Sequence, residues 1–284
     1  MIKNKGIIPI NKPSGWTSFD VVNKIKHMVY PNKVGHLGTL DPMATGVLLV
    51  VVGKATRLFD IMQEKTKTYV ATFEFGYETD TLDSTGKITE NNEYIPTMEE
   101  IEKVLPEFIG KINQIPPKYS AKSINGVRAY DLARKGVEFD IPAKIVEIQS
   151  IEILDYKDKK LILEIKCGSG TYIRSIGRDM AYKLNTLATM TELVRTKAGS
   201  FDILDCYEIE QINKENIENQ LIKIDKILDY PIIELSEIER KKLLNGLILD
   251  LELADGIYKL NNEFDTQALV KIKDFKTKMF LFID

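Results

Sequence analysis

The feature that most constrains this chain is the aliphatic run "VLLVVV" at residues 47–52, which lies between Gly46 and Gly53. A helix that spans a bilayer needs about 20 apolar residues, and this run is the longest purely aliphatic stretch in the chain. A short apolar run between glycines is typical of a buried strand. We therefore expect a soluble protein with a sheet that contains this strand, and no association with membranes.

The patterns around this strand predict an α+β architecture with a large mixed sheet. The segment 67–76 alternates, with Tyr69, Ala71, Phe73 and Phe75 on one face, as in a strand packed on one side. Capping boxes and apolar spacing predict helices at 17–29 and 97–112, and a third helix follows a glycine turn within 169–184. Further strands are expected at 6–15, 143–154, 160–168 and 191–201.

The character of the sequence changes after Cys206. Residues 207–228 are polar and predict a helical connection, and short β-like runs at 258–262, 268–273 and 278–284 predict a small, mainly β module. We therefore divide the chain into a large N-terminal domain (1–206), a helical connection (207–230) and a C-terminal module (231–284).

The charge of the chain is unevenly distributed. The net charge is −3, which alone argues weakly against a nucleic-acid partner. Residues 202–255 hold 14 acidic and 6 basic residues, so the rest of the chain has 33 basic against 28 acidic residues. This surplus is compatible with a basic face that binds nucleic acid and equally with charges spread over a solvated surface.

A short segment, "GHLGTLDPMATG" at 35–46, combines His36 and Asp41 with three glycines and Pro42. Its backbone is too broken for a helix or strand and describes a loop that aims one side chain. Asp before Pro is also a common turn former. Without a metal, a histidine that forms a base partner or a second acid nearby in sequence, a functional Asp41 would act as a nucleophile or as a lone general base.

Two other segments carry residues suited to RNA. Aromatic and basic side chains alternate in the Pro/Gly-rich loop 114–136, as on an RNA-contacting surface, although a solvated loop over packed tyrosines has the same composition. At 168–179, Tyr172 and Arg174 lie at a strand-to-helix turn, where glycines let a ligand approach the backbone. Arg174 could also simply pair with a surface acid.

Metals and cofactors are not expected. Cys167 and Cys206 are 39 residues apart, without the spacing of a metal site or a disulfide framework, and only two histidines are present. Unpaired cysteines favour a reducing, cytoplasmic location.

Several motifs occurring together in one order resemble the bacterial TruB-type tRNA pseudouridine synthases. They are "NKPSGWTS", "GHLGTLDPMATGVL", "KTYVATFEFG", "TDTLDSTG", "QIPPKYSA", "AYDLARKG", "GTYIRSIGRD" and "LVRTKAG", between Ile7 and Phe201. The resemblance implies a pseudouridine-synthase fold with a central catalytic cleft, an RNA-gripping insertion at 116–141 and a PUA-like C-terminal module. It implies isomerisation of uridine 55 in the T loop of tRNA, with base flipping.

The same resemblance implies roles for individual residues. Asp41 would be catalytic, His36 would fill the place of the flipped base, and Tyr69 would stack on that base. Tyr172 and Leu193 would line the pocket, Arg174 would pair with Asp41, and Lys12 and Pro13 would support the loop. The RNA-contacting candidates in the insertion are Lys118, Tyr119, Lys122, Arg128 and Arg134.

Two alternatives to this function remain open from the sequence. One is a pseudouridine synthase that modifies a different RNA, and the other is a tRNA-folding chaperone without catalysis. In the favoured interpretation the partner is the T arm of tRNA, and the protein acts as a monomer with no obligatory protein partner.

Overall fold

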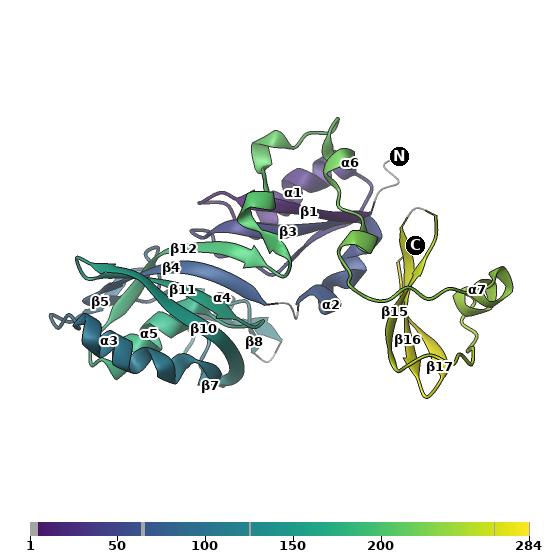
Figure 1. Ribbon diagram of the computed structural model, residues 1–284. Coiled ribbons are helices and arrows are strands. Elements are labelled where there is room, and N and C mark those ends of the chain that lie inside the picture. Colours follow the sequence, from purple (N-terminus) through teal and green to yellow (C-terminus); the bar gives the residue numbers. More distant parts are fainter. Residues whose placement is uncertain (1–4, 64–65, 125, 264, 284) are drawn as a thin grey trace.

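The computed structural model describes residues 5–63, 66–124, 126–263 and 265–283. It has an α+β architecture with one large mixed sheet and a small C-terminal β module, as predicted (Figure 1).

Ten strands form the large sheet. They are β1 (Gly6–Lys12), β2 (Val34–Leu37), β3 (Thr45–Val52), β4 (Lys67–Phe75), β7 (Gly110–Gln114), β10 (Lys144–Lys157), β11 (Lys160–Cys167), β12 (Ala188–Ala198), β13 (Phe201–Asp202) and β14 (Tyr207–Glu208). The main path runs β14–β1–β3–β12–β4–β11–β10–β7, with β2 beside β3 and β13 beside β12. The β1–β14 and β12–β3 pairs are parallel and the others antiparallel, so the sheet is mixed.

The predicted core strand lies near the middle of this sheet. All six residues of the aliphatic run 47–52 are buried in β3. On β4 the residues Tyr69, Ala71, Phe73 and Phe75 are buried as predicted, but Thr68 and Thr72 are buried too. The expectation that β4 is packed on one side only was therefore wrong: on its second face Thr68 and Thr72 are buried, while Val70 and Glu74 are half-buried.

Seven α-helices accompany the strands in the described part of the chain. They are α1 (Ser18–Val29), α2 (Phe59–Gln63), α3 (Met98–Val104), α4 (Ala129–Arg134), α5 (Ile173–Lys183), α6 (Ile217–Gln220) and α7 (Glu237–Leu244). The predicted capping boxes are present at the starts of α1 and α3. Helix α5 packs closely on β4: a Cβ atom on Gly177 would lie 2.3 Å from the Phe73 ring, so only glycine fits there without displacement.

Two helix predictions were too long. The helix expected at 97–112 ends at Val104, continues as a 3₁₀ turn to Phe108 and gives way to β7 at Gly110, since Pro106 lacks an N–H and Gly110 has φ +94°. The connection 207–228 is not one helix but holds the short strand β14, the four-residue helix α6 and 3₁₀ turns. There the Asn213 side chain accepts hydrogen bonds from the N–H groups of Glu215 and Asn216, and such local bonds compete with a continuous helix.

Two-stranded hairpins complete the body: β5 (Tyr77–Thr79) with β6 (Ile88–Asn91), and β8 (Ser123–Ile124) with β9 (Val127–Arg128). The second hairpin and α4 occupy the insertion 116–141, which was expected to be an irregular loop. Gly126 has φ +84° and serves the turn, and the segment "AYDLAR" contains good helix formers.

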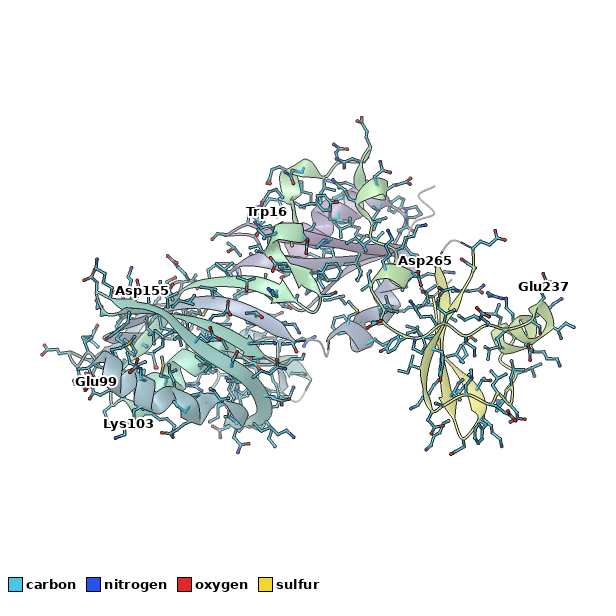
Figure 2. All side chains as sticks on the ribbon, in the orientation of Figure 1. Trp16, Glu99, Lys103, Asp155, Glu237 and Asp265 are labelled. Carbon is cyan, nitrogen blue, oxygen red and sulfur yellow. The ribbon has the colours of Figure 1, made fainter. Side chains whose placement is uncertain are left out.

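The C-terminal module is a three-stranded antiparallel sheet of β15 (Gly256–Asn261), β16 (Thr266–Lys273) and β17 (Lys276–Phe282). It has a small core of its own, but Leu269 and Ile283 join a core cluster that also contains Ile7 of β1. Asp265, at the junction visible in Figure 2, accepts a hydrogen bond from the N–H of Asp225 (2.8 Å). None of the helices in the described residues is long and apolar enough to cross a membrane.

Candidate active site

Asp41 lies in the loop between β2 and β3. The expectation that the whole segment 35–46 is irregular was wrong in part: β2 extends to Leu37 and pairs with β3, which places His36 in a strand opposite Val50. Hydrogen bonding along β3 extends order into a segment whose glycines suggested a loop. The irregular backbone is confined to residues 38–44.

Lys12 supports this loop from the end of β1. Its amine is buried and donates hydrogen bonds to the carbonyl oxygens of Pro13 (2.9 Å), Trp16 (2.5 Å) and Pro42 (3.2 Å). Burial lowers the pKa of Lys12 to about 8, even though the carboxylate of Asp41 acts in the opposite direction. Lys12 and Pro13 therefore lie behind the loop that carries Asp41.

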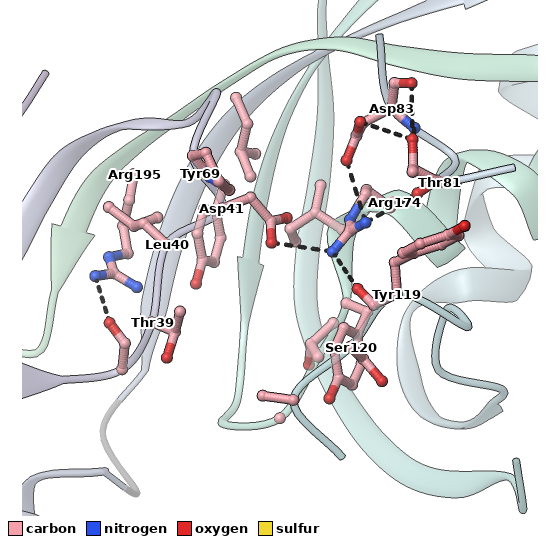
Figure 3. Close-up of a pocket in the computed structure, with 18 of the residues that line it drawn as sticks. Thr39, Leu40, Asp41, Tyr69, Thr81, Asp83, Tyr119, Ser120, Arg174 and Arg195 are labelled. Atoms are coloured by element: carbon pink, nitrogen blue, oxygen red, sulfur yellow. Dashed lines mark hydrogen bonds and ion pairs between the residues drawn. The ribbon is translucent and has the colours of Figure 1, made fainter. Parts of the chain in front are cut away.

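One cavity of about 570 Å³ brings together residues from distant parts of the sequence (Figure 3). Of the residues singled out from the sequence, those that line it are Asp41, Tyr69, Tyr119, Arg134, Tyr172, Arg174 and Leu193. They come from the β2–β3 loop, β4, the insertion, the start of α5 and β12. The cavity therefore forms where the central strands meet the insertion.

The Arg174 guanidinium, which is 6% exposed, joins two carboxylates. One terminal nitrogen lies 3.0 Å from Asp41 Oδ1, and the other lies 3.1 Å from Asp83 Oδ2. Arg174 also donates to the carbonyl oxygens of Thr81 (2.9 Å) and Tyr119 (3.2 Å). These bonds fix the plane of the guanidinium and therefore the position of the terminal nitrogen that faces Asp41.

The pKa of Asp41 is raised above its ordinary value. Burial is the largest cause, and the neighbouring Asp83 carboxylate adds to it, whereas Arg174 and Lys12 favour the ionised form and lower the pKa. The side chain nevertheless keeps 31% exposure to the cavity. An acid of this kind is reachable and can exchange between its charged and neutral forms.

Sequence reasoning missed Asp83, although it lies in the quoted motif "TDTLDSTG". Asp83 is 4% exposed and accepts hydrogen bonds from the hydroxyls of Thr81 (2.8 Å) and Thr85 (2.5 Å). A short run with two threonines around an acid was the available signal, but the pairing with Arg174 spans 91 residues and cannot be read from spacing.

Arg195 on β12 was also missed, although it lies in the quoted motif "LVRTKAG". It is fully buried, lines the cavity wall beside Tyr69, and its guanidinium lies 6.0 Å from the centre of the Tyr69 ring. Burial raises the pKa of Tyr69, so this phenol stays neutral at physiological pH.

The other predicted residues lie outside the cavity lining. His36 is half-buried on β2, and burial lowers its pKa, with a further contribution from Arg195. Lys118 and Arg128 are exposed and Lys122 is half-buried. Arg134, in contrast to these residues, lines the cavity, and its guanidinium lies 5.6 Å from the centre of the Tyr130 ring.

Metal ligands do not gather in the described residues: no group of three or more His, Cys, Asp or Glu side chains there is placed to hold an ion. Cys167 and Cys206 are free, and burial raises the pKa of their thiols to about 11 and about 12.

The class of this protein follows from its match to a known family. Residues 26–173 match the model of the TruB family pseudouridylate synthase (N terminal domain), which makes the chain a pseudouridine synthase. The chain belongs to the TruB family.

Its relatives include tRNA pseudouridine synthase B of Caldanaerobacter subterraneus, 43% identical over 95% of this chain and 91% of the relative. The enzyme of the same name from Clostridium kluyveri is 40% identical over 96% of this chain and 98% of that relative. Among solved structures, a chain of an H/ACA RNP bound to a substrate RNA containing 2'-deoxyuridine superposes with a TM-score of 0.71. That match covers 98% of this chain and 85% of the other at 21% identity, and it supports the fold alone.

Proposed function

We propose that this enzyme converts uridine 55 in the T loop of tRNA to pseudouridine, with Asp41 as its single catalytic aspartate. The observation that carries the proposal is the placement of Asp41 beside Arg174, at 3.0 Å, in a cavity also lined by Tyr69. The names of the relatives support tRNA as the substrate.

In the proposed reaction, the ionised Asp41 either attacks C1′ of the ribose or removes the proton at C2′ to give a glycal. In both routes the bond between N1 and C1′ breaks. The uracil then turns and C5 bonds to C1′: in the first route this bond displaces the Asp41 carboxylate from C1′, and in the second Asp41 returns its proton to C2′. Finally the proton leaves C5 and N1 gains one. Arg174 favours the ionised carboxylate and holds it in one orientation, against the burial that raises its pKa.

The target base has to leave its stack to reach Asp41, at a cost of a few kcal/mol. Tyr69 would stack on the flipped base, Tyr172 and Leu193 would flank it, and His36 would fill the vacated place in the RNA. A lowered pKa supports this role for His36, because a neutral imidazole can replace a base in a stack more readily than a charged one.

We further propose that the protein acts as a monomer in the cytoplasm without an obligatory protein partner. The cavity is assembled within one chain, and both described cysteines are free thiols. Residues 1–206 would carry the chemistry and the insertion 116–141 the grip on the T arm. Residues 207–230 would connect this part to the module 231–284, whose separate core supports treating it as a unit.

The test is to incubate the purified chain with an unmodified tRNA transcript and map pseudouridine at nucleotide resolution. We expect one modified position, nucleotide 55, and the purified chain should run as a monomer. Asp41→Asn keeps the shape of the side chain and should remove catalysis while leaving tRNA binding within about threefold. Modification at another position, or turnover of the Asn variant within tenfold of wild type, would contradict the proposal.

A further inference from the structure

We propose that Arg195 is a positioning residue of this active site: it clamps both ends of the loop that carries Asp41. The inference rests on the proposed role of Asp41 and extends it to a residue that acts through the loop carrying Asp41.

The clamp is a fork of hydrogen bonds. Arg195 Nε donates to the carbonyl oxygen of Val47 (2.6 Å), which follows the loop, and a terminal nitrogen donates to that of Gly38 (3.0 Å), the first residue of the loop. Figure 3 shows this guanidinium on the opposite side of Asp41 from Arg174. One planar group thus fixes the distance between the two ends of the loop.

The backbone of Arg195 is tied to the same place. Arg195 pairs with Gly46 of β3 and with Tyr69 of β4, so β12 joins the loop to the residue expected to stack on the base. The contact with Gly46 is so close that a Cβ atom there would lie 2.2 Å from the Arg195 carbonyl oxygen, and Gly46 has φ +99°. A small shift of Arg195 would therefore be passed on to the loop and to Tyr69 together.

Burial indicates that this arrangement serves more than packing. Arg195 is 0% exposed, and among the described residues no carboxylate lies within ion-pair distance of its guanidinium. One of its terminal nitrogens has no hydrogen-bond partner in that part of the chain. A buried, uncompensated charge is costly for folding, and sites that break such a rule are commonly functional.

The test compares Arg195→Met with wild type in single-turnover reactions at saturating tRNA, well below the melting temperature. Misplacement of a catalytic group by about 1 Å costs about 100-fold in rate, and we expect a loss of this order with the Kd for tRNA within about threefold. Arg195→Lys keeps the charge but has one nitrogen, which cannot bond both carbonyl oxygens in the geometry of the guanidinium. Its rate should therefore lie between those of wild type and Arg195→Met.

Thr189→Val is the matched control. Thr189 is a fully buried residue of the same strand, and its hydroxyl donates to the Tyr77 carbonyl oxygen (3.0 Å), far from the loop. This variant should lose thermal stability but keep its rate within threefold. The proposal fails if Arg195→Met, like Thr189→Val, has a lower melting temperature than wild type but keeps its rate within threefold of wild type. If the Met variant does not fold, the Lys variant decides by the same criterion.

Hydrogen exchange of residues 38–44 separates this proposal from the function it rests on. We expect the loop to lose protection in Arg195→Met and to keep it in Thr189→Val. If wild type forms no pseudouridine, the proposed function fails while the exchange result still decides the clamp. Unchanged protection of the loop in Arg195→Met would overturn it.

Discussion

Opposing influences act on the charge of Asp41. Burial and Asp83 favour its neutral form, whereas Arg174 and Lys12 favour the ionised form, and the net effect is a raised pKa. A carboxyl group with a raised pKa in the folded state costs stability once the pH exceeds its pKa in the unfolded state. At pH values above the unfolded-state pKa, the Asp41 carboxyl group therefore lowers the free energy of unfolding.

This balance predicts how Asp41→Asn affects stability. Between the ordinary pKa of an aspartate and the raised value, the folded state holds more protons than the unfolded state, so wild-type stability falls as the pH rises through this interval. The Asn variant lacks this loss. Its stability relative to wild type should therefore increase from pH 3 to pH 7, as measured by urea unfolding at each pH. A constant difference across this range would show that the pKa of Asp41 is not raised.

A second prediction at this scale concerns Asp83. Its charge raises the pKa of Asp41, and its carboxylate holds Arg174 at 3.1 Å. Asp83→Asn should move the acid limb of the rate–pH profile to lower pH, because a like charge is removed. It should also lower the plateau rate, because Arg174 loses a charged partner. An acid limb that stays in place or moves to higher pH would contradict this assignment.

At the scale of elements, the sequence predicted those features that depend on local pattern. The buried strand β3, the capping boxes of α1 and α3 and the strands of the C-terminal module all follow from apolar spacing or from a local hydrogen bond. The connection 207–228 was misjudged because its isoleucines pack into the core from separate short turns. The pairing of Arg174 with Asp83 and the fork of Arg195 depend on strand order, which one sequence does not reveal.

The contact between α5 and β4 gives a prediction at this scale. Alanine is favoured over glycine in a helix by up to about 1 kcal/mol, but the new Cβ of Gly177→Ala would lie 2.3 Å from the Phe73 ring. Overpacking of this kind costs about 1–3 kcal/mol, so the clash should win and the variant should be less stable. It should also be slower, because α5 carries Arg174.

A double-mutant cycle tests the cause. Phe73→Leu makes room for the added methyl group, so Gly177→Ala should cost less stability in that background than in wild type, as measured by chemical unfolding. Additive losses would show that the helix and the ring do not interfere.

At the scale of the whole molecule, charge and packing separate the insertion from the C-terminal module. Lys118, Arg128 and Arg134 are exposed on the insertion, and Arg134 also lines the cavity. The module shares a core cluster with β1 through Leu269 and Ile283, so its removal would uncover apolar residues of that cluster such as Ile7. Surface substitutions leave this core cluster intact, so they are a cleaner test of where the RNA binds than a truncation.

If the insertion grips the T arm, log K for tRNA should fall steeply with log salt, by about 0.7 to 0.9 per phosphate contacted. Changing Lys118, Arg128 and Arg134 together to Gln should weaken binding and flatten the slope by about two to three units, with little effect on the chemical step at saturating tRNA. The matched control removes the same charge from three exposed lysines of β16 and β17: Lys271, Lys273 and Lys278. Their loss should change the slope by less than one unit, since phosphates that they do not contact release no counterions. A control that flattens the slope as much as the insertion variant would place the RNA on the C-terminal module.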